Sequence, residues 1–145
     1  MSPIKKKFAV TIRKPPEDLY AAFINLQRWP EWVSILLEVK DIEPNPIQVG
    51  TKFIQHSRIL GKNIITDSKI VTLDSNRTFE YIGGGTIPLE LRCDFEETDQ
   101  GTRVILFTML DPGRFFGIPR PLVERGVTQM VKTDLANFKK WIENT

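Results

Sequence analysis

Hydrophobic and more polar residues alternate along much of this chain, which is the pattern of strands that bury one face. A first strand is predicted where Phe8, Val10 and Ile12 alternate with their neighbours. Six further strands are predicted near residues 38–43, 51–60, 62–73, 78–82, 86–97 and 102–110. Short connections rich in Gly, Pro, Asn and Asp separate them, so neighbouring strands are expected to form antiparallel hairpins.

Two stretches instead follow the three- and four-residue steps of an amphipathic helix. The first begins at Pro16, which suits a first helical turn, and continues into a second short helix at Trp29, giving a pair of about 20 residues. The second stretch predicts one long helix over residues 121–144. Gly and Pro interrupt the pattern at residues 111–120, and the triple glycine at 83–85 predicts a loop or bulge.

This order of elements predicts an α+β fold in which a curved sheet buries one face against the last helix. Seven antiparallel strands make a wide sheet, and twisted sheets of this width curl. A helix laid along the concave side need not fill the space beneath it. We therefore expect a ligand cavity between the sheet and the helix at residues 121–144.

Composition narrows the class of protein further. The 145 residues are 41% hydrophobic and 26% charged, which is typical of one globular domain spanning residues 1–145. A net charge of +2 is too small for affinity that depends on a phosphate backbone, so nucleic acid is not an expected partner. The single cysteine, Cys93, excludes an internal disulfide and favours a reducing, cytoplasmic location. Neither a signal peptide nor a transmembrane segment is predicted.

Four short motifs resemble those of a known family. In chain order they are Pro15–Tyr20 (PPEDLY), Trp29–Trp32 (WPEW), Val49–Phe53 (VGTKF) and Gly101–Val104 (GTRV), followed by the long terminal helix. Together they resemble the START-like polyketide cyclase/dehydrase branch of the helix-grip (SRPBCC) ligand-binding superfamily. The resemblance implies a helix-grip fold, a deep cavity under the long helix, and lipids, sterols, polyketides or other mostly apolar molecules as ligands. Superfamily members include binders, carriers and enzymes, so the reaction stays open.

Four residues are candidates for acid–base catalysis: His56, Asp67, Glu80 and Tyr81. His56 is the only histidine, and its ordinary pKa lies near neutrality. An inward-facing carboxyl of Asp67 or Glu80 would be desolvated, as an acid catalyst requires. Both faces of the strand at 51–60 mix polar and apolar residues, so the sequence leaves the direction of His56 open. No residues have the spacing of a metal site, and no cofactor is expected.

Aromatic, aliphatic and polar side chains on the predicted strands and helices are the candidates for ligand binding, because a small-molecule pocket needs apolar walls and a few polar groups. The candidate ligand-binding residues are Trp32, Phe53, Gln55, Ser57, Phe79, Tyr81, Leu89, Leu91, Phe115, Phe116 and Met130. The candidate polar groups that would orient a ligand are Gln55, Ser57, Thr66, Ser68 and Tyr81. Phe115 and Phe116 lie in the Gly- and Pro-broken segment, where they suit a mobile gate over the cavity mouth.

Three functions remain open at this point. The leading hypothesis is a protein that binds a small hydrophobic molecule between the sheet and the last helix. An enzyme of the cyclase, dehydratase or hydrolase type is the alternative, and it requires at least two of the candidate acid–base groups to converge. A protein-interaction module acting through the outer sheet face or through Phe115 and Phe116 is the third. A weak homodimer is a further expectation about partners.

Overall fold

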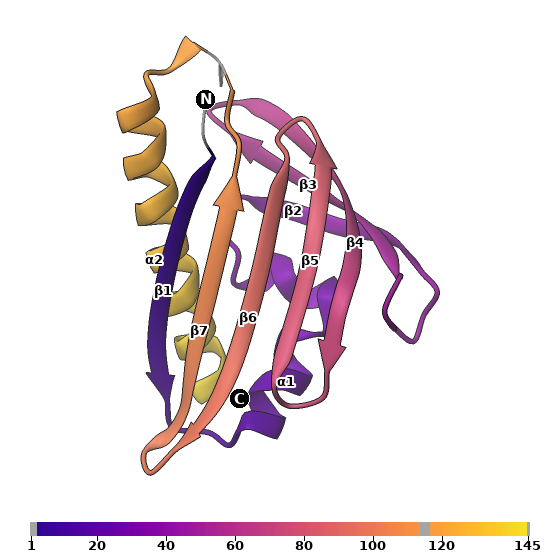
Figure 1. The fold of residues 1–145 in the computed structure, drawn as a ribbon, viewed down its shortest axis with the longest axis vertical. Coiled ribbons are helices and arrows are strands. Elements are labelled where there is room, and N and C mark those ends of the chain that lie inside the picture. The colour runs from indigo at the N-terminus through magenta and orange to yellow at the C-terminus, as the bar shows by residue number, and fades with distance from the viewer. Residues whose placement is uncertain (1–2, 114–116, 145) are drawn as a thin grey trace.

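A single curved antiparallel sheet dominates the fold (Figure 1). The computed structural model describes residues 3–113 and 117–144, and within them seven strands pair in the order β1-β7-β6-β5-β4-β3-β2. The strands are β1 (Ile4–Ile12), β2 (Leu36–Glu43), β3 (Lys52–Ile59), β4 (Lys62–Asp74), β5 (Thr78–Gly85), β6 (Leu89–Thr98) and β7 (Gly101–Leu110). All neighbouring pairs except β1–β7 follow one another along the chain, which confirms the predicted hairpins.

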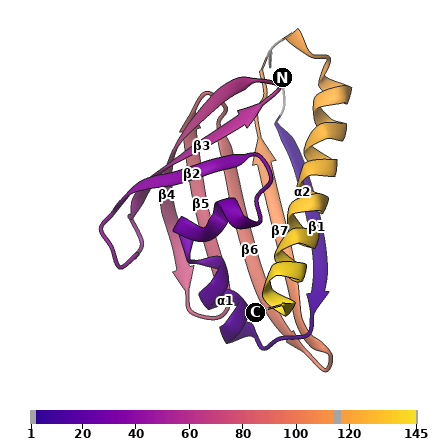
Figure 2. The ribbon, with the colours of Figure 1, turned by 180° about the vertical axis from the view of Figure 1, so that it is seen from behind.

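Three helical elements cover the concave face of the sheet: α1 (Pro16–Phe23), the 3-10 helix η1 (Leu26–Glu31) and α2 (Arg120–Glu143) (Figure 2). The second short helix was expected to begin at Trp29, but η1 begins three residues earlier and is a tight 3-10 turn. Pro30 lies inside η1 and lacks the backbone N–H that a longer α-helix would need. None of the described helices is both long and apolar enough to cross a membrane.

The alternation of apolar and polar residues along the strands gives the sheet one buried, concave face and one exposed, outer face. Phe79, Cys93 and Leu106 lie side by side on β5, β6 and β7 and are all buried on the concave face. The buried face of α2 packs against this interior and comprises Val127, Val131, Leu135, Phe138 and Ile142. The fold is therefore the predicted curved sheet with a long C-terminal helix and short helices after the first strand.

The triple glycine is part of a strand, which corrects the expected loop or bulge. Gly83, Gly84 and Gly85 pair with β4, so β5 runs past its predicted end at residue 82 and β6 begins only at Leu89. A Cβ atom on Gly83 would lie 2.6 Å from the Cγ2 atom of Thr66. That neighbour is a side-chain methyl group, whereas at Gly85 φ is 102° and a Cβ atom would lie 2.5 Å from the backbone oxygen of Ile65, so Gly85 is the position that requires glycine.

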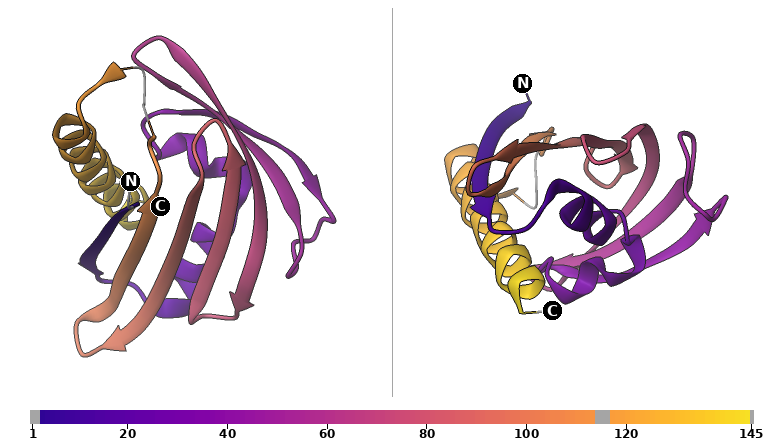
Figure 3. Two further views of the ribbon diagram at one scale, coloured as in Figure 1. Left: turned by 45° about the horizontal axis from the view of Figure 1, so that its top comes forward. Right: turned by 90° about the horizontal axis from the view of Figure 1, so that it is seen from below.

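Helix α2 bridges the two edges of the sheet. Figure 3 shows the sheet curving around α1 and η1, with α2 running along the β1 side. At β1, Lys6 Nζ lies 3.2 Å from Glu124 Oε1 of α2. Near the other edge, the backbone N–H and the hydroxyl of Ser34 donate to Asp134 Oδ1 at 2.9 and 3.0 Å. These contacts hold the helix against both edges of the sheet.

Asp134 provides a direct test of this attachment. Replacing Asp134 by Ala should lower the free energy of unfolding by about 1–2 kcal/mol, because Ser34 loses the acceptor of both hydrogen bonds. Asp134→Asn keeps an acceptor oxygen and should retain most of the stability. Burial raises the pKa of Asp134 and disfavours its charged form, whereas the two hydrogen bonds from Ser34 favour that form and oppose the rise. Urea denaturation of both variants measures the difference, and equal losses would contradict the role of the acceptor oxygen.

Candidate functional site

The side chains on the concave face of the sheet are fully buried at one end and only half-buried at the other. At the end covered by α1, Cys93 and Phe95 of β6 are 0% and 5% exposed. Farther along the same strand, the inward-facing Leu91 and Leu89 are only half-buried. The half-buried end is the one where the β3–β4 and β5–β6 connections and the beginning of α2 lie (Figures 1 and 2). We call it the open end, and the end beneath α1 the closed end.

An aromatic cluster fills the interior toward the closed end. Neighbouring ring centroids in this cluster lie 4.8 to 6.4 Å apart, mostly in edge-to-face orientations that favour aromatic pairs. Its members are Phe23, Trp29, Trp32, Phe53, Phe79, Tyr81, Phe95 and Phe138. Trp32, Phe53 and Phe79, three of the predicted pocket walls, are therefore packed mainly against other aromatic rings.

Three polar side chains meet above this cluster on the concave face. Gln55 Nε2 donates a hydrogen bond to Ser68 Oγ at 3.1 Å, and the Gln55 side chain also hydrogen-bonds to Tyr81. Gln55 is 8% exposed, Ser68 3% and Tyr81 5%. We call these residues the Gln55–Ser68–Tyr81 group. Ser57 and Thr66, the other two predicted polar groups, are buried on the same face beside it.

Tyr81 is a neutral hydroxyl donor over the whole physiological pH range. Burial raises the pKa of Tyr81 from 10.0 to about 12, and the side-chain hydrogen bond with Gln55 only partly opposes this rise. Because the unfolded chain ionises first, the stability that the neutral phenol contributes is intact below pH 10 and is lost between about pH 10 and 12.

Ultraviolet titration of tyrosinate tests this environment. The chain has two tyrosines, and burial raises the pKa of Tyr20 as well, so the Tyr20→Phe variant isolates Tyr81. Its native form should show no tyrosinate at pH 10, whereas the denatured form should be about half ionised there. Half-ionisation of the native variant at pH 10 would contradict the burial of this phenol.

The remaining catalytic candidates lie away from this group. Phe53, Gln55 and Ser57 face inward, so His56 faces outward, where its Nε2 atom lies 3.0 Å from Asn63 Oδ1. Asp67 is exposed between the buried residues of β4. Glu80 accepts a hydrogen bond of 2.7 Å from the Thr72 hydroxyl on the same outer face. The four candidates therefore do not converge.

The remaining candidate ligand-binding residues fall into two groups: those whose burial is described, and two that lie outside the described residues. Leu89 and Leu91 are half-buried at the open end, and Met130 is half-buried on α2. Phe115 and Phe116 lie outside the described residues. Two hollows with described linings open on the surface around Arg13 and Lys14, and Tyr81 lines neither. Among residues 3–113 and 117–144, no cluster of His, Cys, Asp and Glu is suited to a metal ion.

Two features of the interior were not predicted from the sequence. Trp32 Nε1 is buried and has no hydrogen-bond partner. Within the described part of the chain, no other buried side-chain donor or acceptor lacks a partner. Lys6 points to the concave face at the open end and pairs with Glu124, although a run of lysines is typical of a solvated strand start. Its shared parity with Phe8 and Val10 could have revealed this direction, whereas no sequence signal marks the unpaired indole.

Comparison with known proteins supports this fold throughout the chain. The crystal structure of protein TTHA0849 from Thermus thermophilus has a TM-score of 0.82 and 17% identity, covering 97% of this chain and 98% of that one. The di-domain ARO/CYC protein StfQ from the steffimycin biosynthetic pathway has a TM-score of 0.80 and 14% identity, covering 99% of this chain and 52% of that one. Ara h 8.0201 has a TM-score of 0.75 and 16% identity, covering 99% of each chain.

The sequence itself carries the assignment to a family. No curated protein sequence is significantly similar to this chain. Residues 4–143 nevertheless match the family described as polyketide cyclase/dehydrase and lipid transport. This match spans nearly the whole domain and agrees with the curved sheet, the long C-terminal helix and the motifs at the first helices. The chain therefore belongs to the polyketide cyclase/dehydrase and lipid transport family, within the SRPBCC superfamily.

Proposed function

We propose that this protein binds a small, mainly apolar molecule between the sheet and α2, with the Gln55–Ser68–Tyr81 group orienting one polar atom of that molecule. The group itself is the observation that carries the proposal. Three hydrogen-bonded polar side chains occupy an interior where folding alone would favour apolar residues. Pockets for small molecules typically combine apolar walls with a few convergent polar groups of this kind.

The chemistry of the group restricts the ligand to an uncharged hydrogen-bond acceptor. Tyr81 stays protonated, and in the proposed complex its O–H donates to a carbonyl or hydroxyl oxygen of the ligand while its oxygen accepts from Gln55. The buried polar residues of the described chain are threonines, serines and a glutamine, without a charged side chain among them. A charged ligand atom would meet no counter-charge there and would be poorly solvated.

The apolar part of the ligand would occupy the half-buried open end. Leu89 and Leu91 line the concave face beyond the aromatic cluster. Trp32 Nε1 is a further donor in the interior and has no hydrogen-bond partner, so an acceptor atom of a ligand would satisfy it. Lipids, sterols and polyketide-like molecules share the required chemistry, which is a large apolar body with few oxygen atoms.

Binding is favoured over catalysis by the arrangement of the acid–base candidates. Tyr81 is the only one of the four that faces the interior, since His56, Asp67 and Glu80 lie on the outer face. Its pKa of about 12 is too high for efficient proton exchange near neutral pH. We therefore place this protein among the binding and carrying members of its family rather than the cyclases.

Ligand capture and thermal stabilisation test the proposal together. Native mass spectrometry of the purified protein should reveal a bound apolar molecule. If none is retained, fatty acids, sterols and aromatic polyketides should be screened for compounds that raise the melting temperature of the protein. A ligand that raises the melting temperature of the wild-type protein but not of a variant with Leu91→Asp on the concave face would support interior binding. The matched control is Glu90→Asp, on the outer face of the same strand. Equal stabilisation of all three proteins would refute an interior site.

A further inference from the structure

The β3–β4 turn exposes a leucine that neither folding nor the turn itself requires. Leu60 is 72% exposed and has a φ angle of 52°, followed by Gly61 at 75°. Two-residue hairpin turns with both φ angles positive strongly favour Asn, Asp and Gly. The other described non-glycine residues with positive φ are Asp41 and Asn76, whose side chains tolerate this conformation. Leu60 thus combines a disfavoured backbone conformation with an exposed apolar side chain, and such strain suggests a function outside the fold.

Basic residues flank this leucine. Arg58 and Lys62 are exposed on either side of Leu60, and residues 57–63 (SRILGKN) contain no acidic side chain. The turn therefore presents one apolar side chain between two cations. This is the combination that binds the boundary between charged headgroups and acyl chains in an anionic lipid surface.

The beginning of α2 extends this surface. Leu122 in its first turn is 53% exposed, and Arg125 is exposed one turn later. Figures 1 and 2 both place the beginning of α2 and the β3–β4 turn at the open end of the molecule. We call Arg58, Leu60, Lys62, Leu122 and Arg125 the open-end surface.

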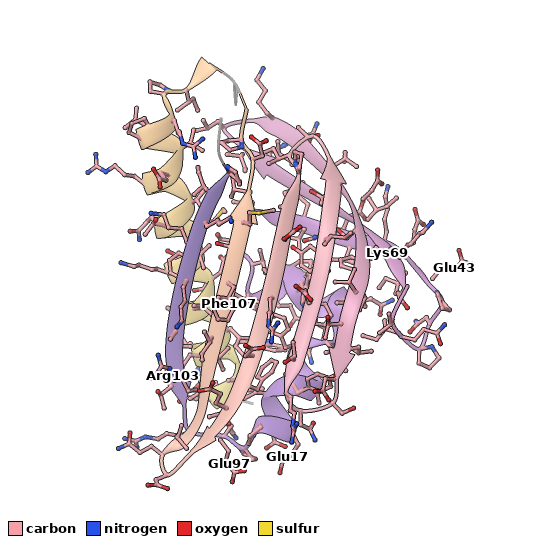
Figure 4. The ribbon with its side chains drawn as sticks, in the orientation of Figure 1. Glu17, Glu43, Lys69, Glu97, Arg103 and Phe107 are labelled. Atoms are coloured by element: carbon pink, nitrogen blue, oxygen red, sulfur yellow. The ribbon has the colours of Figure 1, made fainter. Side chains whose placement is uncertain are left out.

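The opposite end of the molecule carries exposed charges of both signs. Exposed acidic residues lie at the start of α1 and at the end of β6, where Figure 4 labels Glu17 and Glu97, and the exposed Arg13 and Arg103 lie at the same end. Asp18 and Asp99 are exposed beside them. A negatively charged surface would therefore attract the β3–β4 turn, where both charges are positive, more strongly than the mixed charges of the closed end.

We propose that the open-end surface docks on an anionic lipid bilayer, with Leu60 inserted among the lipids and Arg58 and Lys62 at the headgroups. A bilayer accepts a single protruding side chain without a matching pocket, whereas a protein partner would need a complementary concave surface. Docking in this orientation turns the half-buried end of the interior toward the lipid. The proposal goes beyond ligand binding and stands whether or not the interior holds a ligand.

Vesicle sedimentation of the full chain tests this docking. Wild-type protein should sediment with vesicles of phosphatidylcholine and phosphatidylglycerol, should bind vesicles of phosphatidylcholine alone much more weakly, and should dissociate as salt is raised. Leu60→Asn should weaken binding to the anionic vesicles about tenfold, because the inserted apolar surface is lost. This variant also suits the turn better, so its melting temperature should be unchanged or higher and misfolding cannot explain the loss.

Matched variants separate the surface from general effects. Arg58→Gln combined with Lys62→Gln should weaken binding by about tenfold or more. Val49→Asn removes an apolar side chain that is 61% exposed in the β2–β3 connection, and Lys69→Gln removes a cation from the outer face of β4 (Figure 4). Neither control should change binding. The proposal is overturned if Leu60→Asn binds as well as wild type, if both controls weaken binding equally, or if wild type does not prefer anionic vesicles.

Fluorescent labelling identifies the inserted residue directly. Cys93 is the only native cysteine and is 0% exposed, and burial raises the pKa of its thiol, so a cysteine introduced at position 60 is labelled selectively. An environment-sensitive dye on Leu60→Cys should shift its emission to the blue with anionic vesicles, whereas the same dye on Val49→Cys should not. Absence of a shift at position 60 despite sedimentation would assign the docking to another surface and refute the proposal.

Discussion

Replacing Phe23 by alanine is expected to lower the free energy of unfolding by about 3–5 kcal/mol. Phe23 is 2% exposed on α1 and lies at the centre of the aromatic cluster. Its ring centroid is within 5.5 to 5.9 Å of those of Trp29, Trp32, Phe79, Phe95 and Phe138. Truncation would remove contacts from every side at once, and the surrounding rings belong to four separate elements that cannot all move inward to fill the space.

Urea denaturation of three variants measures this effect. Phe23→Leu should recover part of the stability, because it refills much of the volume without the aromatic contacts. Gln27→Ala, an exposed position on the neighbouring η1, should change the free energy of unfolding by less than about 0.5 kcal/mol. A loss below about 1 kcal/mol for Phe23→Ala would mean that the cluster does not anchor α1 as the structure indicates.

Replacing Tyr81 by phenylalanine should weaken binding of an oxygen-containing apolar ligand by about tenfold or more. The ring and its contacts with Trp29 and Phe53 are kept, and only the hydroxyl that would donate to the ligand is removed. A buried acceptor atom left without a donor accounts for a loss of this size. The variant should also lose a little stability, because the Gln55 side chain loses a hydrogen-bond partner.

Tyr20→Phe is the matched control for this experiment. Tyr20 is the only other tyrosine, is 6% exposed, and packs edge-to-face on Phe95 outside the Gln55–Ser68–Tyr81 group. Calorimetric titration should give the same affinity for this variant as for the wild-type protein. Equal losses in both variants would indicate a general effect of core hydroxyls, and no loss in Tyr81→Phe would remove the phenol from the proposed site.

Regular alternation made most of the fold predictable from the sequence. On β6, Cys93 and Phe95 alternate with charged residues, and the structure buries them while leaving Glu90 and Arg92 exposed. The strand at 51–60 could not be oriented in this way because both of its faces mix polar and apolar residues. Its direction depends on partners far away in the sequence, since Phe53 packs against Trp29 and Tyr81. Once Phe53 is inward, Gln55 follows and His56 must face outward.

Sequence patterns gave the wrong local structure where contacts between distant parts of the chain determine it. The triple glycine suggests a turn by composition, yet its backbone pairs with Thr66, Asp67 and Ser68 of β4 and is therefore a strand. The helix pattern after Trp29 is compatible with an α-helix, but Pro30 limits that segment to a 3-10 helix. The unpaired Trp32 Nε1 atom depends on which groups surround a buried ring, and spacing along the chain carries no information about it.

Intermolecular nuclear Overhauser effects between a bound apolar ligand and the protein would show whether the ligand lies between the sheet and α2. The ligand is the molecule retained by the purified protein or, failing that, the compound that most raises its melting temperature. We predict contacts from the ligand to the Tyr81 ring and the Leu91 methyl groups on the concave face, and none to His56 or Ile82 on the outer face. Contacts confined to His56 and Ile82, or the absence of any ligand that binds, would contradict the account.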